Sequence, residues 1–506
     1  MPQTSSIAKN TLFLYVRMLA TLCVTLYTSR VVLQALGVID YGIYNVVAGV
    51  STSLVFFSST LSTSTQRFLN FEMGRGNSHR VNRIFSMSLL IYSGIALIVM
   101  IAGLSLGDWL VADKLVIPED KRGAAQIVLL AMLLSLSFML VASVFESVLI
   151  ARENMKLYAW LGITDALAKL GIAYAVMWLP DKLVVYAILM VVAQLVPYVI
   201  MTAYCLRHYP ESRFSRGWDG SLIKEMFGFI GWNLYGSAAW MVNDQGISII
   251  LNFFFGPVVN AARGIAVAVN GAINNFNAQF FTAVRPQLVK RYAAQETASL
   301  ITLIYSSTKF SVFLLWLLCL PIMLRAGFIL NLWLADVPEW TETFVIWALL
   351  FTIVSSLCNP TYTAVSATGH IRRTSLIGGT LFLAAFPLSY VALKAGAPPM
   401  IVYPMLMAGR FAFFLVAVCE LRKYVPVSFR EYAVMVGWPV LKVLSVSFAL
   451  MYALNRVAPQ NLAGLLGVAL AAVIVNGFLM YCFGSTAAER RMIVEKLNRI
   501  LAKFRK

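Results

Sequence analysis

The sequence predicts an all-α polytopic membrane protein with about fourteen transmembrane helices. Of its 506 residues, 60% are apolar and only 12% are charged. Apolar segments of about twenty residues, long enough to cross a bilayer as helices, recur along the whole chain. The loops between them are short, so we expect the function to reside among the helices.

The apolar segments follow one another from the N-terminus to the C-terminal tail. We expect spans at 11–33, 41–63, 84–106, 124–150, 159–179, 183–205, 227–252, 258–283, 301–324, 341–363, 375–394, 398–419, 433–455 and 461–483. An even number of spans places both termini on one side of the membrane. The first span carries Arg17 and no small-residue cleavage site follows it, so we expect it to stay uncleaved.

The net charge of +18 raises the question of a nucleic-acid partner. Most of the 40 Lys and Arg residues, however, fall in alternate loops. Loops rich in Lys and Arg lie on the cytoplasmic side of membrane proteins. We therefore expect both termini in the cytoplasm and no nucleic-acid partner.

The sequence indicates neither a metal site nor a cofactor. The six cysteines lie in or at the ends of spans without paired spacing, and the three histidines fall in separate loops.

The C-terminal tail is a separate element. Thr486 and Glu489 form a capping-box pattern, and the apolar residues of 493–504 share one face of a basic helix. We expect this helix to lie on the cytoplasmic leaflet.

Charged residues inside the expected spans point to function. They are the basic residues Arg17, Lys169, Arg263, Lys309, Arg410 and Lys442 and the acidic residues Glu146, Asp165 and Asp244. A charge at the bilayer centre costs at least about 2.5 kcal/mol, so we expect these side chains to line a water-filled cavity. The excess of positive charge suits an anionic cargo.

Two neighbouring spans carry the strongest polar stripes. One face of 227–252 holds Asn233, Ser237, Trp240, Asp244 and Ser248, and one face of 258–283 holds Arg263, Asn270, Asn274 and Asn277. Asp244 and Arg263 lie at comparable depth on either side of a turn, where an ion pair would be broken by cargo or by a coupling proton or sodium ion. Interhelical hydrogen bonding alone is the structural alternative.

Two further charged positions have a structural explanation beside the functional one. Arg17 either lines the cavity or extends its side chain to the headgroups. Asp165 and Lys169 stand four residues apart, which is the spacing of an intrahelical ion pair.

Three cations have no helical partner in the sequence. Of these, Lys309 is the best cavity candidate, whereas Arg410 and Lys442 are not ranked as site residues.

A membrane glycosyltransferase or glycan polymerase is the alternative from another class. The outer loops hold carboxylates that such an enzyme would use, namely Asp40, Asp108, Asp113, Glu119 and Asp120. The chain has neither a GxSxG pattern nor a phosphate-binding glycine loop. Solvated loop charge explains the carboxylates more simply.

An internal repeat emerges when Gly37 is aligned with Gly256. Each lies in a short turn between two apolar spans (LGVIDYGIYNVV and FGPVVNAARGIA), and each second span ends in a basic, polar cluster (TQRFL and VRPQL). Transporters often contain such repeats. We expect two halves joined near 206–224.

Several stretches carry a resemblance to one known family. They are NTLFLYVRML at 10–19, YTSRVVLQALGVIDYGIYNVVAGV at 27–50, TQRFLNFEMG at 65–74, IARENMKLYA at 150–159, GWNLYGS at 231–237, NFFFGPVVNAARGIA at 252–266 and RPQLVKRYA at 285–293. Here the chain resembles the polysaccharide and O-antigen flippases of the multidrug, oligosaccharidyl-lipid and polysaccharide exporter superfamily. Beyond about residue 300 the resemblance continues mainly as hydropathy.

The resemblance implies an architecture and an activity. The architecture is two six-helix lobes around a central cavity, at 1–205 and 227–419, with a linker at 206–226, two additional helices at 420–483 and a basic amphipathic tail at 484–506. The activity is alternating access that moves a polyprenyl-diphosphate-linked oligosaccharide across a bacterial inner membrane. Membrane lipids and glycan-assembly proteins such as a polysaccharide polymerase are the further partners it suggests.

The family has no single signature that assigns roles to residues, so we infer roles for the candidate site residues from the chemistry of the implied cargo. Arg17, Arg263 and Lys309 suit the diphosphate, while Trp240 and the amides of Asn270, Asn274 and Asn277 suit the sugars. Gly231, Gly236, Gly256 and Pro257 are candidate bending points. No cofactor is implied, and Asp244, Asp165 and Lys169 are candidates for ion coupling or ion pairing.

Two related cargo classes fit less well. The peptidoglycan-precursor flippases usually have a basic residue within the second span, and 41–63 has none. Multidrug export would favour an anionic cavity for cationic drugs, which the excess of positive charge argues against.

Overall fold

The described part of the chain is helical and contains no strand. The computed structural model describes residues 2–109, 122–217, 219–334, 336–487 and 489–491. Two expectations lie outside these residues: the amphipathic helix at 493–504, and the outer-loop carboxylates Asp113, Glu119 and Asp120.

The internal contacts divide the chain into two compact units. Unit 1 contains Met1–Leu234 and Thr282–Gln295, and unit 2 contains Tyr235–Phe281 and Glu296–Lys506. Helix α6 (Gly220–Ala293) begins in unit 1, continues through unit 2 and ends in unit 1. Neither unit is therefore one continuous stretch of chain.

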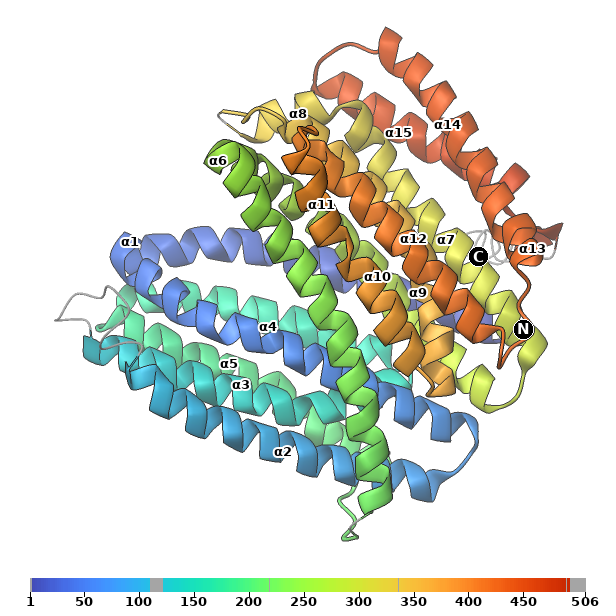
Figure 1. Cartoon of the computed structure of the whole chain (residues 1–506). Helices are drawn as coiled ribbons and strands as arrows, with labels where there is room; N and C mark the ends of the chain where they lie inside the picture. Colours follow the sequence, from blue (N-terminus) through green and yellow to red (C-terminus); the bar gives the residue numbers. More distant parts are fainter. Residues whose placement is uncertain (1, 110–121, 218, 335, 488, 492–506) are drawn as a thin grey trace, which may run out of the picture. The chain divides into compact units, whose positions relative to one another are not determined.

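Unit 1 consists of helices α1 to α5 and the two ends of α6 (Figure 1). The helices are α1 (Pro2–Gly74), α2 (Ser78–Trp109), α3 (Arg122–Ala151), α4 (Met155–Ala175) and α5 (Lys182–His208), with short 3₁₀ turns at Val176–Trp178 and Pro210–Ser212. Leu14 of α1, Ile150 of α3 and Ala283 of α6 share one buried apolar cluster. The returning end of α6 is thus part of the core of unit 1.

Unit 2 adds helices α7 to α15 to the middle of α6. They are α7 (Thr297–Leu324), α8 (Ala326–Trp333), α9 (Thr341–Thr368), α10 (Gly379–Leu383), α11 (Ala385–Lys394), α12 (Val402–Leu421), α13 (Phe429–Tyr432), α14 (Trp438–Val457) and α15 (Leu462–Leu479), with a 3₁₀ turn at Pro399–Ile401 and π-helical turns at Thr374–Gly378, Ala433–Gly437 and Met480–Gly484. Trp316 of α7 donates to Ser447 of α14 over 2.6 Å. Arg325 donates to the carbonyls of Ala458 and Pro459, between α14 and α15. Hydrogen bonds therefore connect α14, and the segment between α14 and α15, to α7 and the residue that follows it.

Ten helical segments among the described residues are long and apolar enough to cross a membrane. Each overlaps one of the spans expected from the sequence, from 84–106 through 183–205 and from 301–324 through 461–483. The remaining expected spans lie in α1 and α6, one on each side of Gly37 and of Gly256. The expectation of an all-α polytopic membrane protein is confirmed.

A single glycine interrupts the helical backbone in each of these two long helices. Gly37 has φ 77° and ψ 172°, and Gly256 has φ 77° and ψ −172°. This region of backbone conformation is open almost only to glycine. The aligned glycines of the repeat thus adopt nearly the same conformation. Figure 1 shows that α1 reverses direction along its length. Gly231 and Gly236, also expected as bending points, keep helical geometry.

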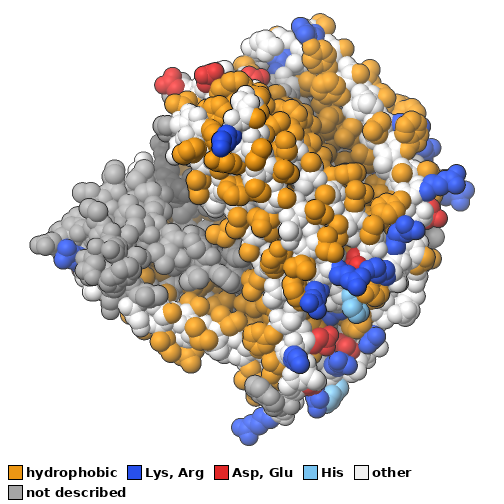
Figure 2. Space-filling model, viewed as in Figure 1, with side chains coloured by type: hydrophobic (Ala, Val, Ile, Leu, Met, Phe, Trp, Pro, Cys, Tyr) orange, Lys and Arg blue, Asp and Glu red, His pale blue; other side chains and the backbone are white. Residues whose placement is uncertain are grey.

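Many large apolar side chains are exposed on the helices. Ile98 of α2 is 66% exposed, Val199 of α5 62% and Leu470 of α15 63%. Figure 2 shows apolar side chains over much of the face in view. In a bilayer such apolar surfaces contact lipid instead of water.

Candidate functional site

The two halves of α6 meet at an ion pair in unit 2. Arg263 Nη2, after the break at Gly256, lies 2.7 Å from Asp244 Oδ1, before it. The same nitrogen donates to the Asp244 carbonyl over 2.9 Å, and Nη1 donates to Ser248 Oγ. The Arg263 side chain is 6% exposed and that of Asp244 40%. Arg263 is therefore neutralised by a carboxylate that remains open on one side.

The amides of the second polar stripe continue from this pair along α6. Asn274 Nδ2 donates to Asn270 Oδ1 over 3.3 Å, and Thr352 of α9 donates to the same oxygen. Asn277 is 3% exposed, and its Oδ1 accepts no hydrogen bond from the described residues. Asn270 and Asn274 thus form a polar cluster with α9, about two to three turns after Arg263.

Trp240 lies one turn before Asp244 on α6 and packs among aromatic rings. Its ring centroid is 5.3 Å from that of Phe382 in a stacked arrangement and 5.7 Å from that of Phe351. Arg410 Cζ of α12 lies 5.4 Å from the Trp240 centroid. The structure therefore brings Trp240 to Arg410, a residue that the sequence analysis did not rank as part of the site.

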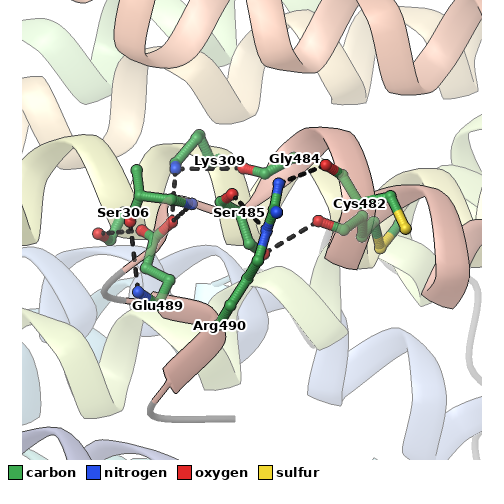
Figure 3. A network of polar contacts seen from close by, with 9 residues as sticks. Ser306, Lys309, Cys482, Gly484, Ser485, Glu489 and Arg490 are labelled. Atoms are coloured by element: carbon green, nitrogen blue, oxygen red, sulfur yellow. Dashed lines mark hydrogen bonds and ion pairs between the residues drawn. The ribbon is translucent and has the colours of Figure 1, made fainter. Parts of the chain in front are cut away.

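Lys309 has a partner from the end of the chain. Its side chain is 2% exposed, and Nζ lies 2.8 Å from Glu489 Oε2 and 3.2 Å from the Gly484 carbonyl (Figure 3). Ser306, one turn earlier on α7, donates to Glu489 Oε1 over 2.7 Å. The ammonium group is thus neutralised by a carboxylate that lies 180 residues further along the chain.

Glu489 also closes the expected capping box. The Thr486 N–H donates to Glu489 Oε2 over 2.8 Å, and the Glu489 N–H donates to Thr486 Oγ1 over 3.3 Å. Burial alone would raise the pKa of the Glu489 carboxyl, but hydrogen bonds from Lys309, Ser306 and Thr486 bring this pKa below its usual value. Next to it, Arg490 donates to the carbonyls of Ser485 and Cys482. The capping box and Arg490 fix the conformation of the segment after α15, and the bonds from Ser306 and Lys309 hold it against α7.

Arg17 belongs to unit 1, where three helices converge on it. Its Cζ lies 4.0 Å from the ring centroid of Tyr158 on α4, whose hydroxyl donates to Glu146 Oε1 on α3 over 2.8 Å. A Cβ atom at Gly162 of α4 would clash with Arg17 Nε, so this glycine makes room for the arginine. Arg17 is therefore part of a packed polar cluster with Glu146.

Asp165 and Lys169 of α4 are joined to each other. Lys169 Nζ lies 2.7 Å from Asp165 Oδ2, and both side chains are partly exposed. The spacing in the sequence therefore corresponds to an intrahelical ion pair.

Arg410 is the candidate that the sequence analysis passed over. No polar stripe surrounds Arg410 on α12. Its signal in the sequence is a cation inside an apolar span with no acidic residue three or four positions away, and Lys309 and Lys442 share this signal. Among the described residues, no group of three or more His, Cys, Asp and Glu side chains is placed to hold a metal ion.

Comparison with solved structures identifies the fold of the chain. No protein-family model and no curated protein matches the sequence. Among solved structures, a MATE in the bent conformation gives a TM-score of 0.72 at 12% identity, covering 86% of this chain and 96% of that one. The Vibrio cholerae MATE transporter VcmN in its bent form gives 0.70 at 16% identity, covering 86% and 100%.

A third structure belongs to the same superfamily as the family suggested by the sequence. It is an outward-facing multidrug resistance MATE family transporter of the MOP superfamily, with a TM-score of 0.69 at 13% identity over 85% of this chain and 96% of that one. Similarity at this level of identity establishes architecture and leaves the cargo open. The chain has the fold of the MATE transporters.

Proposed function

We propose that this protein is a flippase that moves a polyprenyl-diphosphate-linked oligosaccharide across the bacterial inner membrane by alternating access. The observation that carries the proposal is that Arg263 lies on the same face of α6 as Asn270 and Asn274, which form a polar cluster with Thr352 of α9 about two to three turns further along. A guanidinium recognises phosphate oxygens, and amides and hydroxyls hydrogen-bond to sugars. The lipid-linked oligosaccharide of the proposed function has both phosphate oxygens and sugar hydroxyls.

The ion pair gives Arg263 a way to respond to cargo. A diphosphate that reaches Arg263 competes with the Asp244 carboxylate, and release of Asp244 frees a site for a proton or sodium ion. Cargo binding and ion binding are then linked through one arginine.

Location and partners belong to the same proposal. The Lys- and Arg-rich loops support an inner-membrane protein with both termini in the cytoplasm. Membrane lipids surround the exposed apolar helices, and glycan-assembly proteins such as a polymerase would supply or receive the cargo. The MATE fold favours transport over the glycan polymerase considered above.

The test is transbilayer movement in proteoliposomes. A polyprenyl-diphosphate oligosaccharide is supplied on one side, and a glycan-modifying enzyme scores its arrival on the other. We expect movement that requires the protein and is lost in Arg263→Ala. Lys442→Ala is the matched control, because Lys442 is an exposed cation on α14. Full activity in Arg263→Ala would remove this residue from the site.

Multidrug export is the second candidate, favoured by the likeness to a multidrug resistance MATE transporter. It predicts efflux of a cationic dye such as ethidium from cells that express the protein. An excess of cations in the spans repels such a cargo. Efflux without movement of the lipid-linked oligosaccharide would decide for the multidrug activity.

A further inference from the structure

Arg410 differs from the two buried cations of unit 2 that the sequence analysis favoured. Arg263 forms an ion pair with Asp244, and Lys309 forms one with Glu489. Throughout the described ranges, Arg410 forms no ion pair. A cation that is already neutralised attracts an anion weakly, so Arg410 carries the positive charge that remains available in this part of unit 2.

Aromatic rings hold the guanidinium of Arg410. Its Cζ lies 4.9 Å from the ring centroid of Phe413, 5.4 Å from that of Trp240 and 5.9 Å from that of Phe382. Rings attract a cation through their quadrupole and carry no net charge. They therefore fix the position of the guanidinium and leave its charge in place. A carboxylate would neutralise that charge.

Most N–H donors of this guanidinium are also unused. A guanidinium presents N–H groups on each of its nitrogens. Among the described residues it donates one hydrogen bond, from Nη2 to Asn359 Oδ1 at 3.4 Å, and its Nε is buried without a partner. An oxyanion would satisfy these donors in the bidentate geometry that arginine favours.

We propose that Arg410 binds an anionic group of the cargo through its free N–H donors, with Trp240 as the residue that positions it. The ligand chemistry is a phosphate or carboxylate oxyanion, supplied by the lipid diphosphate or by an acidic sugar. This inference rests on the proposed function and adds the residue that contacts the charge. Arg410 lies roughly 12 Å along α12 from Val402, well inside the expected span.

Equilibrium binding to the full-length protein in detergent tests the proposal. The probes are farnesyl-diphosphate-linked N-acetylglucosamine, inorganic pyrophosphate and a glucuronate-containing disaccharide, titrated by calorimetry. We expect Arg410→Gln to weaken binding of the recognised probe at least about tenfold. The affinity of Arg410→Lys should fall between those of the wild type and Arg410→Gln, because an ammonium keeps the charge and loses the bidentate geometry.

Two further variants separate binding from folding. Lys442 lies with Nζ 4.8 Å from the Trp438 ring centroid, so Lys442→Gln removes another cation from a tryptophan and should change the dissociation constant less than about twofold. Trp240→Leu should weaken binding in the wild-type background and have little further effect on Arg410→Gln. A merely structural role for Trp240 would give the same effect in both backgrounds.

The outcomes are distinct. Arg410-dependent binding of the lipid probe alone, or of pyrophosphate as well, supports the assignment and identifies the diphosphate as the anion. Arg410-dependent binding of the disaccharide supports it with an acidic sugar. If Arg410→Gln binds a probe as tightly as the wild type, this inference alone is overturned. If the glutamine variant does not insert, full binding by Arg410→Lys overturns it in the same way. A wild type that binds none of the probes contradicts the proposed function and the inference together.

Discussion

At the scale of single residues, Glu489 acts in two ways from one position. Its carboxylate closes the capping box with Thr486 and neutralises the ammonium group of Lys309. Ion pairs on a protein surface contribute little to stability, but here both side chains are almost fully buried. Removing one member leaves a buried charge without a partner.

Glu489→Gln separates the two roles, because glutamine also serves in a capping box. We expect it to lower the free energy of unfolding by about 3–5 kcal/mol, since Lys309 stays buried and charged. Thr486→Ala, which removes the cap and keeps the ion pair, should cost only about 1 kcal/mol. Thermal unfolding in detergent measures both.

The double variant Lys309→Met with Glu489→Gln is the decisive control. With neither charge present, most of the lost stability should return. If the double variant is as unstable as Glu489→Gln alone, the unpaired lysine is not the cause.

The same carboxylate predicts a pH dependence. The pKa of Glu489 is lower in the folded protein than its usual value of about 4.3. Its contribution is then fully present above that value and is lost as the pH falls through the folded pKa. Unfolding of the wild type and of Glu489→Gln, measured from pH 7 to pH 3, should differ constantly down to about pH 4.3 and converge below it. A difference that disappears near pH 6 would contradict this assignment.

The residue scale also shows what the sequence does not reveal. The capping box was predictable, because Thr486 and Glu489 are three positions apart. The partner of Lys309 was not, because 180 residues separate the two. The surroundings of Arg410 come from α6, α9, α10 and α12, and no local pattern in the sequence connects these segments.

At the scale of elements, two glycines shape the two longest helices. Both adopt a conformation that other residues reach only with strain, and both leave open space where a Cβ atom would lie. A substitution there therefore tests backbone conformation alone.

We expect Gly37→Ala and Gly256→Ala each to destabilise the protein by about 1–3 kcal/mol. The matched controls are Gly94→Ala in α2 and Gly271→Ala in α6, which sit in regular helix with the same open space. Alanine should stabilise these helices by roughly 0.5–1 kcal/mol. Equal unfolding temperatures for the four variants would show that the two glycines are not conformationally required.

The elements were largely predictable because both hydropathy and glycine act locally. A run of about twenty apolar residues is a span wherever it lies in the fold. The alignment of Gly37 with Gly256 anticipated a shared turn, and the two residues share their backbone angles. The sequence did not show that a single residue suffices for each turn, since an apolar pattern does not encode loop length.

At the scale of the whole molecule, unit 1 is assembled from two separate parts of the chain. Glu153, between α3 and α4, accepts hydrogen bonds from Gln287 over 2.6 Å and from Lys290 over 2.8 Å. Both donors lie on the returning end of α6. The first two hundred residues therefore do not contain all of unit 1.

This arrangement predicts the behaviour of a divided chain. Fragments 1–217 and 219–506, expressed together, should purify as a complex, because the second fragment carries the missing part of unit 1. Glu153→Ala in the first fragment should reduce its recovery, whereas Lys156→Ala, at an exposed position of α4, should not. Recovery unaffected by Glu153→Ala would show that these two bonds contribute little to assembly.

The ion pair between Lys309 and Glu489 also has a consequence for biosynthesis. The lysine is translated 180 residues before its partner. At a rate of about 5–20 residues per second, Glu489 is synthesised roughly 10–40 seconds after Lys309, and until then the lysine lacks this carboxylate. A polypeptide that terminates early never supplies this carboxylate. The stability of α7 therefore depends on whether synthesis continues to Glu489.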